Sequence, residues 1–224
     1  MKDFFKQNRL FIGLCLMFLV ALGGALLFCP KGEMHLWLNP QHTPVLDAFL
    51  RDYTLVGEWI PYIVVGLLLF YKTGWSVFLL ANVAISGGIS QGLKYAFNTD
   101  RPLTWFAENM PDVQLQLVEG VRMSEWYSFP SGHTTTFFVL FFTLAIIIRE
   151  SKLKYKDLLI ILCFILAVLG GYSRIYLSQH FAEDIWGGAI LGTLTTILLY
   201  AAVPALKRKE KFWNWSILHF FEKK

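Results

Sequence analysis

Charged residues are scarce in this 224-residue chain: Asp, Glu, Lys and Arg make up 16% of it, against about 25% in an average soluble domain. Hydrophobic residues make up 55%. The three cysteines (Cys15, Cys29 and Cys163) are too few for a disulfide framework, and no internal repeat, low-complexity tract or linker divides the chain. These features exclude a soluble domain, a disordered chain, a collagen-like fibre and a disulfide-stapled secreted domain. They indicate a polytopic membrane protein with a single domain over residues 1–224.

Six apolar stretches are predicted to form membrane-spanning helices, because about 20 helical residues cross a hydrocarbon core of about 30 Å. They cover residues 10–28, 55–71, 75–97, 134–148, 158–177 and 184–203. The basic start also suits a signal peptide, but the first apolar stretch is too long for one and residues 28–30 form a poor cleavage site. Residues 32–54 are predicted to be a loop with an amphipathic helix near 43–53. The predicted fold class is therefore all-α, a bundle of six transmembrane helices.

The basic residues orient this bundle, since short cytoplasmic loops carry an excess of Lys and Arg. A cytoplasmic N-terminus places 14 of the 20 basic residues on the cytoplasmic side. The six left on the outer side are Lys31, Arg51, Lys94, Arg101, Arg122 and Arg174. This asymmetry predicts that both termini are cytoplasmic. Trp213 and Trp215, beside a basic run, suggest that the C-terminal tail lies on the inner leaflet.

Three polar segments emerge on the predicted outer face: residues 94–102, 130–133 and 173–184. Lys94 and Arg101 are seven residues apart, so they share a face if the helix continues that far, and Pro102 then ends it. Arg174 adds a third cation, and guanidinium groups are suited to bidentate contact with phosphate oxygens. The segments therefore predict a site for an anion with several oxygens.

Ser131 and Gly132 precede the predicted fourth span, where backbone N–H groups and the positive end of the helix dipole favour an anion. Gly132 allows the backbone to approach that anion closely. Ser131 could cap the helix, bind phosphate, or do both. We expect both residues to join the three cations in binding phosphate.

Two histidines and an aspartate complete the predicted site. His180 and Asp184 are spaced four apart, so the carboxylate can hold the imidazole tautomer on one face of a helix. A neutral imidazole held in this way is a suitable nucleophile towards phosphorus. His133 then suits the general acid for the leaving oxygen, and later the base that activates water. Three cations favour the charged transition state, so we expect neither a metal ion nor another cofactor.

These residues resemble the signature of the type-2 phosphatidic acid phosphatase family, the integral-membrane lipid phosphate phosphatases. The three-part signature is Lys-x6-Arg-Pro, Pro-Ser-Gly-His and Ser-Arg-x5-His-x3-Asp, and every defining position is present within a core of about residues 75–200. The resemblance implies metal-independent hydrolysis of a phosphomonoester or pyrophosphate through a phosphohistidine, with the roles given above. Vanadium haloperoxidases have a similar motif, but six spans argue against that soluble relative.

The sequence leaves the roles of several other residues undecided. Glu58 lies near the outer end of the second span, where function and simple hydration are equally good interpretations, so it is left out of the site. His35, His42 and His219 have no partner at a useful spacing. Residues 102–129 form a long polar and aromatic loop, which we expect to cap the outer cleft and to help select the lipid headgroup.

The leading hypothesis is a lipid phosphatase of a plasma or bacterial inner membrane, with its active site on the extracytoplasmic side. Its partners are the bilayer and a lipid phosphate; no nucleic acid and no obligate protein partner are expected. Undecaprenyl pyrophosphate is the first choice of substrate, and phosphatidylglycerophosphate, phosphatidic acid and lipid A phosphates are the alternatives. The contrasting hypothesis is an anionic-lipid transporter, for which we would expect inverted repeats or broken helices that the sequence does not show.

Overall fold

The computed structural model describes residues 2–39, 42–207 and 209–218, and every regular element among them is a helix. The helices are α1 (Lys2–Gln7), α2 (Arg9–Phe28), α3 (Lys31–Leu38), α4 (Pro44–Thr54), α5 (Val56–Tyr71), α6 (Thr73–Phe97), α7 (Pro102–Asn109), α8 (Gly132–Glu150), α9 (Lys156–Tyr176), α10 (Ala182–Tyr200), α11 (Val203–Lys207) and α12 (Glu210–Trp213). The all-α prediction is confirmed. Each predicted span corresponds to one long helix, with boundaries shifted by a few residues, and α4 is the expected amphipathic helix.

Not all of these long helices are apolar enough to cross a membrane. Among the described residues, α2, α8, α9 and the stretch from Thr73 to Asn109 that contains α6 meet that condition. The helices α4 and α5 are bent by 45° and count as a fifth candidate if they form one span. The 19-residue α10 is not among the candidates, because Glu183 and Asp184 make its first turn polar. The described residues thus contain four or five candidate spans, and the sixth stays a prediction.

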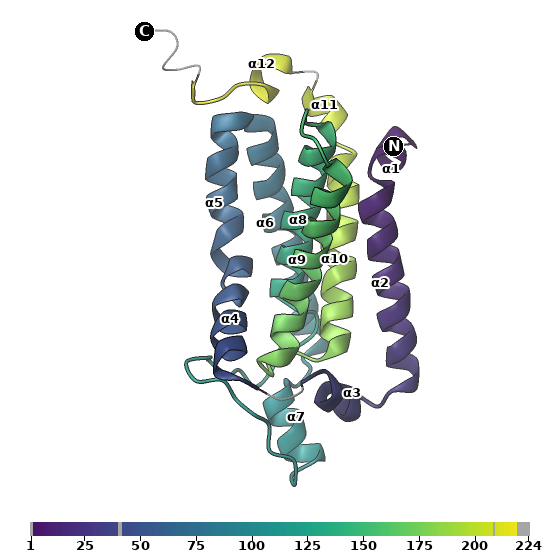
Figure 1. Cartoon of the computed structure of the whole chain (residues 1–224), viewed down its shortest axis with the longest axis vertical. Coiled ribbons are helices and arrows are strands. Elements are labelled where there is room, and N and C mark those ends of the chain that lie inside the picture. The colour runs from purple at the N-terminus through teal and green to yellow at the C-terminus, as the bar shows by residue number, and fades with distance from the viewer. Residues whose placement is uncertain (1, 40–41, 208, 219–224) are drawn as a thin grey trace.

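The central element of the bundle is α8, which contacts α5, α6, α9 and α10 (Figure 1). Its buried side chains include Phe137, Phe138 and Phe142. Gly188 of α10 lets that helix approach α8 closely, since a Cβ there would lie 2.6 Å from the carbonyl oxygen of Ser131. This contact holds the N-terminal turn of α8, which carries the second signature segment.

The two ends of the bundle differ (Figure 1). One end holds α1, the α5–α6 and α8–α9 turns, α11 and α12, whereas the other holds α3, α7 and the α9–α10 junction. The three signature segments therefore lie at one end, opposite the N-terminal helix, as the predicted topology requires. Which side of a membrane each end faces stays a prediction.

The C-terminal segment is docked on the bundle. Trp213 is buried against Trp75 of α6, with ring centroids 5.2 Å apart. The N–H of Thr73 donates to the carbonyl oxygen of Trp215 at 2.9 Å. For Trp213, packing against α6 thus replaces the expected contact with the inner leaflet; His219 lies outside the described residues.

Candidate active site

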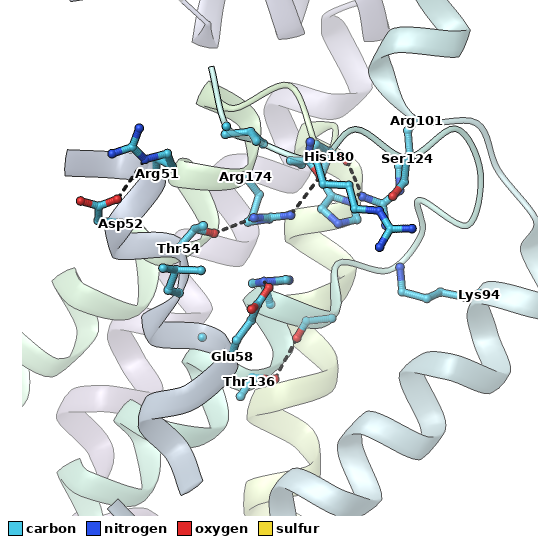
Figure 2. A pocket seen from close by; sticks show the side chains of 18 of the residues that line it. Arg51, Asp52, Thr54, Glu58, Lys94, Arg101, Ser124, Thr136, Arg174 and His180 are labelled. Atoms are coloured by element: carbon cyan, nitrogen blue, oxygen red, sulfur yellow. Dashed lines mark hydrogen bonds and ion pairs between the residues drawn. The ribbon is translucent and has the colours of Figure 1, made fainter. Parts of the chain in front are cut away.

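A cavity of about 770 Å³ lies at the end of the bundle where the signature segments meet. Six of the eight predicted site residues line it: Lys94, Arg101, Gly132, His133, Arg174 and His180. Figure 2 shows Lys94 and Arg101 on one side of the cavity and Arg174 near its centre. The remaining two, Ser131 and Asp184, lie behind the wall and support residues that line it.

His180 is buried in the junction between α9 and α10. Its Nδ1 lies 3.2 Å from Asp184 Oδ2, so the predicted contact is present, but the expected shared helix face is wrong because His180 precedes α10. The same oxygen accepts hydrogen bonds from Ser128 Oγ at 2.5 Å and from the Phe181 N–H at 2.8 Å. A carboxylate fixed in this way orients the imidazole and leaves Nε2 available to a ligand. Ser128 had no signal in the sequence, because it contacts Asp184 across 56 positions.

The surroundings of His180 keep its imidazole neutral. Burial lowers the pKa of His180 well below the ordinary 6.5, and the charges of Arg101, Lys94 and Arg174 lower it further. A neutral imidazole retains the lone pair that a nucleophile needs. The fold therefore gives His180 the protonation state that its predicted role requires.

His133, in the first turn of α8, contacts a residue that the sequence left undecided. Its Nε2 lies 2.9 Å from Glu58 Oε1 of α5. The Glu58 side chain lines the cavity and is 44% exposed. Glu58 is therefore part of this cavity rather than only a hydrated residue at a helix end. The sequence signal for Glu58 was an ionisable residue within an apolar stretch. Its partner His133 lies 75 positions away, so no residue spacing could have predicted their contact.

Arg174 is held by neutral groups. Its Nη1 donates to Thr54 Oγ1 at 2.6 Å, and its Nη2 donates to Gln179 Oε1 at 3.3 Å. Its Nε is buried and has no hydrogen-bond partner in the described part of the chain. Two of the five N–H donors of this guanidinium are thus engaged with neutral groups, and other donors on Nη1 and Nη2 remain. Thr54 and Glu58 flank the bend between α4 and α5, so this bend contacts both Arg174 and His133.

Lys94 and Arg101 reach the cavity from different elements, so their expected position on one helix face is wrong. The helix α6 ends at Phe97, because Asn98 adopts a left-handed backbone with φ of 43°. Arg101 instead immediately precedes α7, and Pro102 begins that helix. Both cations donate to backbone carbonyls of the following loop: Lys94 Nζ to Tyr127 at 2.5 Å and Ser128 at 3.4 Å, and Arg101 Nε to Trp126 at 3.0 Å.

Ser131 caps α8. Its Oγ accepts from the Thr134 N–H at 3.3 Å and from Thr134 Oγ1 at 2.9 Å. The Ser131 side chain is fully buried and is not part of the cavity wall, whereas Gly132 is. Of the two roles left open by the sequence, the structure shows the cap.

Two of the histidines that had no partner at a useful spacing in the sequence have partners in the structure. His42 Nδ1 lies 2.9 Å from Asp47 Oδ1, and the His42 ring stacks on Tyr176 with centroids 4.2 Å apart. His35 is buried, with Nε2 3.4 Å from Ser178 Oγ, and burial lowers the pKa of His35 to about 4. Neither lines the cavity. Both contact the residues just before His180 and brace that junction.

The segment between Arg101 and Pro130 forms α7 and then a loop. Gly120, Val121, Arg122 and Ser124 of this loop line the cavity. Part of the segment thus lines the cavity, while its role as a cap and in headgroup selection stays a prediction. No group of three or more His, Cys, Asp or Glu side chains that could hold a metal ion occurs among the described residues.

A neutral imidazole that faces a cluster of cations is suited to phosphoryl transfer, and here it lies at the end of membrane-length helices. The fold and the cavity thus define a membrane-bound phosphatase. Sequence comparison identifies the family: the chain belongs to the PAP2 superfamily, whose family model matches residues 75–208. The resemblance noted in the signature is confirmed, and with it the expected class of enzyme, a phosphatase that hydrolyses phosphate esters.

The chain is similar to curated phosphatases that act on lipids. Phosphatidylglycerophosphatase B of Bacillus subtilis is 28% identical over 182 residues, which cover 77% of this chain and 78% of the relative. Lipid A 4'-phosphatase of Bacteroides thetaiotaomicron is 29% identical over 174 residues, 75% of this chain and 74% of the relative. The crystal structure of Aquifex aeolicus LpxE matches with a TM-score of 0.62 and 25% identity, over 78% of this chain and 96% of that one.

Proposed function

We propose that this chain hydrolyses the phosphate of a membrane lipid through a phosphohistidine at His180. The observation that carries the proposal is the buried His180–Asp184 pair, 3.2 Å apart, beside a cavity that also contains His133 and three cations. His180 Nε2 attacks phosphorus, the bond from phosphorus to the lipid oxygen breaks, and His133 gives that oxygen a proton. His133 then takes a proton from water, which attacks the phosphohistidine, releasing inorganic phosphate and restoring the imidazole.

Lys94, Arg101 and Arg174 bind the phosphate oxygens in this mechanism. The two guanidinium groups of Arg101 and Arg174, which both line the cavity, allow bidentate contacts with these oxygens. Gly132 brings the helix N-terminus to the phosphate, and Ser131 supports it as the cap. These charges stabilise the transition state and make the reaction independent of metal ions.

Glu58 extends the predicted site by acting on His133. Because Nε2 is the atom that Glu58 contacts, the carboxylate keeps a proton there and stabilises the imidazolium. In the reaction Nε2 gives its proton to the leaving oxygen, while the negative charge of Glu58 remains beside the ring. Glu58 is thus a positioning residue for the general acid.

We further propose six spans, cytoplasmic termini and a cavity on the extracytoplasmic side of a plasma or bacterial inner membrane. The excess of basic residues at the opposite end supports this orientation. The test uses Glu119→Cys near the cavity and Lys154→Cys in the α8–α9 turn, each in a chain whose three native cysteines are replaced by serine. An impermeant thiol reagent outside intact cells should label only the first. The reverse pattern would place the cavity in the cytoplasm.

The substrate is a lipid whose phosphate lies at the membrane interface. An outward-facing cavity favours undecaprenyl pyrophosphate, the first choice from the sequence. The names of the relatives favour phosphatidylglycerophosphate and the lipid A 4'-phosphate, which are the second candidates.

Phosphate release from the detergent-solubilised chain tests the proposed reaction. Wild-type protein, offered these lipids and phosphatidic acid, should release inorganic phosphate and carry acid-trapped labelled phosphate. His180→Ala should do neither, and His133→Ala should slow the reaction by about 10²–10⁴-fold, as loss of a general acid does. No release from any lipid, or labelled phosphate on the His180→Ala protein, would contradict the proposal.

A further inference from the structure

Two cations on the cavity wall belong to none of the signature segments: Arg51 near the end of α4 and Arg122 in the loop before α8. Apolar packing sets their positions. Leu50 and Val118, which precede them closely in sequence, are buried in one cluster. Arg51 Cδ also lies 3.9 Å from where a Cβ on Gly120 would stand. The loop and α4 are therefore fixed to each other, and each presents an arginine to the cavity.

Both charges are available to a ligand. Arg122 is exposed and forms no hydrogen bond or ion pair with any residue that the structure describes. Arg51 pairs only with the adjacent Asp52 in the same part of the chain, at 3.0 Å, with side chains 42% and 66% exposed. Such an exposed pair contributes little and is easily exchanged for a better acceptor.

Arg51 is separate from the cations of the signature. Figure 2 shows Arg51 on the opposite side of Arg174 from Lys94 and Arg101. A single phosphate held for attack by His180 would therefore not be neutralised by Arg51. The cavity of about 770 Å³ lies within the range of about 300–1,000 Å³ that is typical of sites for whole small molecules.

We infer that Arg51 and Arg122 form a second anion subsite, which binds another phosphate of the same lipid headgroup. This inference rests on the proposed function and narrows its substrate class, because it favours the second candidates over undecaprenyl pyrophosphate. The two phosphorus atoms of a pyrophosphate share a bridging oxygen, so both would contact the signature cations. A subsite that includes Arg51, on the far side of Arg174 from Lys94 and Arg101 (Figure 2), instead fits a headgroup whose two phosphates are separated by an organic spacer.

A matched pair of lipids tests the subsite. Phosphatidylglycerophosphate and phosphatidic acid both end in a phosphomonoester, but only the first also carries a phosphodiester. With equal acyl chains and the same detergent, wild-type kcat/KM should be higher for phosphatidylglycerophosphate. Arg51→Gln and Arg122→Gln should each lower the ratio of the two kcat/KM values by about 3- to 5-fold, as expected for exposed charge pairs. The loss should appear in KM for phosphatidylglycerophosphate.

The double variant and charge-retaining variants complete the test. Arg51→Gln with Arg122→Gln should lower the ratio by about 10- to 25-fold if the two sites act independently. Arg51→Lys and Arg122→Lys should retain much of the wild-type ratio of the two kcat/KM values. Lys154→Gln, at the other end of the bundle, should leave this ratio at the wild-type value. An equal loss on both lipids, or an unchanged ratio in the double variant, would overturn the subsite alone. No phosphate release by wild type from any lipid would overturn the proposed function and the subsite with it.

Discussion

Because Glu58 contacts His133, a substitution of Glu58 can test the proposed general acid while His133 itself stays unchanged. Glu58→Gln keeps the shape of the side chain and its ability to accept a hydrogen bond, and removes only the charge. The expected result is slower protonation of the leaving oxygen, because the imidazolium of His133 loses its carboxylate. Formation of the phosphohistidine at His180 should slow while binding of the lipid changes little.

The exposure of the pair sets the size of this effect. A hydrogen bond to a charged group contributes about 1.5–3 kcal/mol when it is shielded from water. Here the His133 side chain is 22% exposed and that of Glu58 is 44% exposed, so solvent screens the interaction. A value of about 1 kcal/mol, the upper end for exposed pairs, is appropriate. It corresponds to about a 5-fold loss of rate.

A single-turnover assay separates this role from a general structural one. Labelled phosphate trapped on the protein by acid quench gives the rate of phosphohistidine formation. The loss in Glu58→Gln should be seen with a lipid substrate and should shrink with p-nitrophenyl phosphate, whose leaving group needs no proton. Asp157→Asn, which removes an exposed carboxylate at the other end of the bundle, should match wild type. Equal losses on both substrates, or no loss on either, would refute the assigned role.

Three further predictions address charge, packing and pH. Activity should survive EDTA, because protein cations supply the positive charge; full loss that Mg²⁺ restores would contradict this. Gly188→Ala should lower stability by about 1–3 kcal/mol in detergent melts, since its Cβ would meet the Ser131 carbonyl oxygen at 2.6 Å. Gly88→Ala, whose Cβ has no neighbour within 4 Å, should be neutral or stabilising. Burial, with nearby cations, holds the pKa of His180 below 6.5, so protons bind preferentially to the unfolded chain. Stability should therefore fall as pH drops below about 6.5, and should fall less in His180→Gln.

The parts of this site that the sequence predicted are those encoded locally. The four-residue spacing of His180 and Asp184 predicted their contact, found at 3.2 Å, although His180 precedes α10 and the two residues do not share a helix face. The alternation of apolar stretches predicts that the three signature segments lie at one end of the bundle, because helices that cross in turn return their ends to alternate sides. Ser131 before an apolar helix predicts a cap. Each of these inferences needs only a period or a neighbouring residue.

The parts that the sequence missed depend on contacts between distant segments. Glu58 meets His133 across 75 positions, and Ser128 meets Asp184 across 56. No periodicity links such pairs, since their distance is set by how α5 and the loop pack on the bundle. The prediction that Lys94 and Arg101 share a helix face was wrong for a different reason. Asn98 leaves the helix with a positive φ, a conformation that asparagine adopts more readily than most residues.

The acceptors around the cations explain how positive charge is kept for a phosphate. Lys94 and Arg174 are only 9% and 6% exposed, and a buried charge without partners is strongly unfavourable. Carboxylate partners would reduce this cost of burial, but they would also cancel the positive charge that attracts the phosphate of the substrate. In the described structure these cations and Arg101 donate instead to neutral oxygens of carbonyl, hydroxyl and amide groups. Glu58 and Asp184 are directed to the two histidines and Asp52 to Arg51, so among the described residues no carboxylate forms an ion pair with Lys94, Arg101 or Arg174.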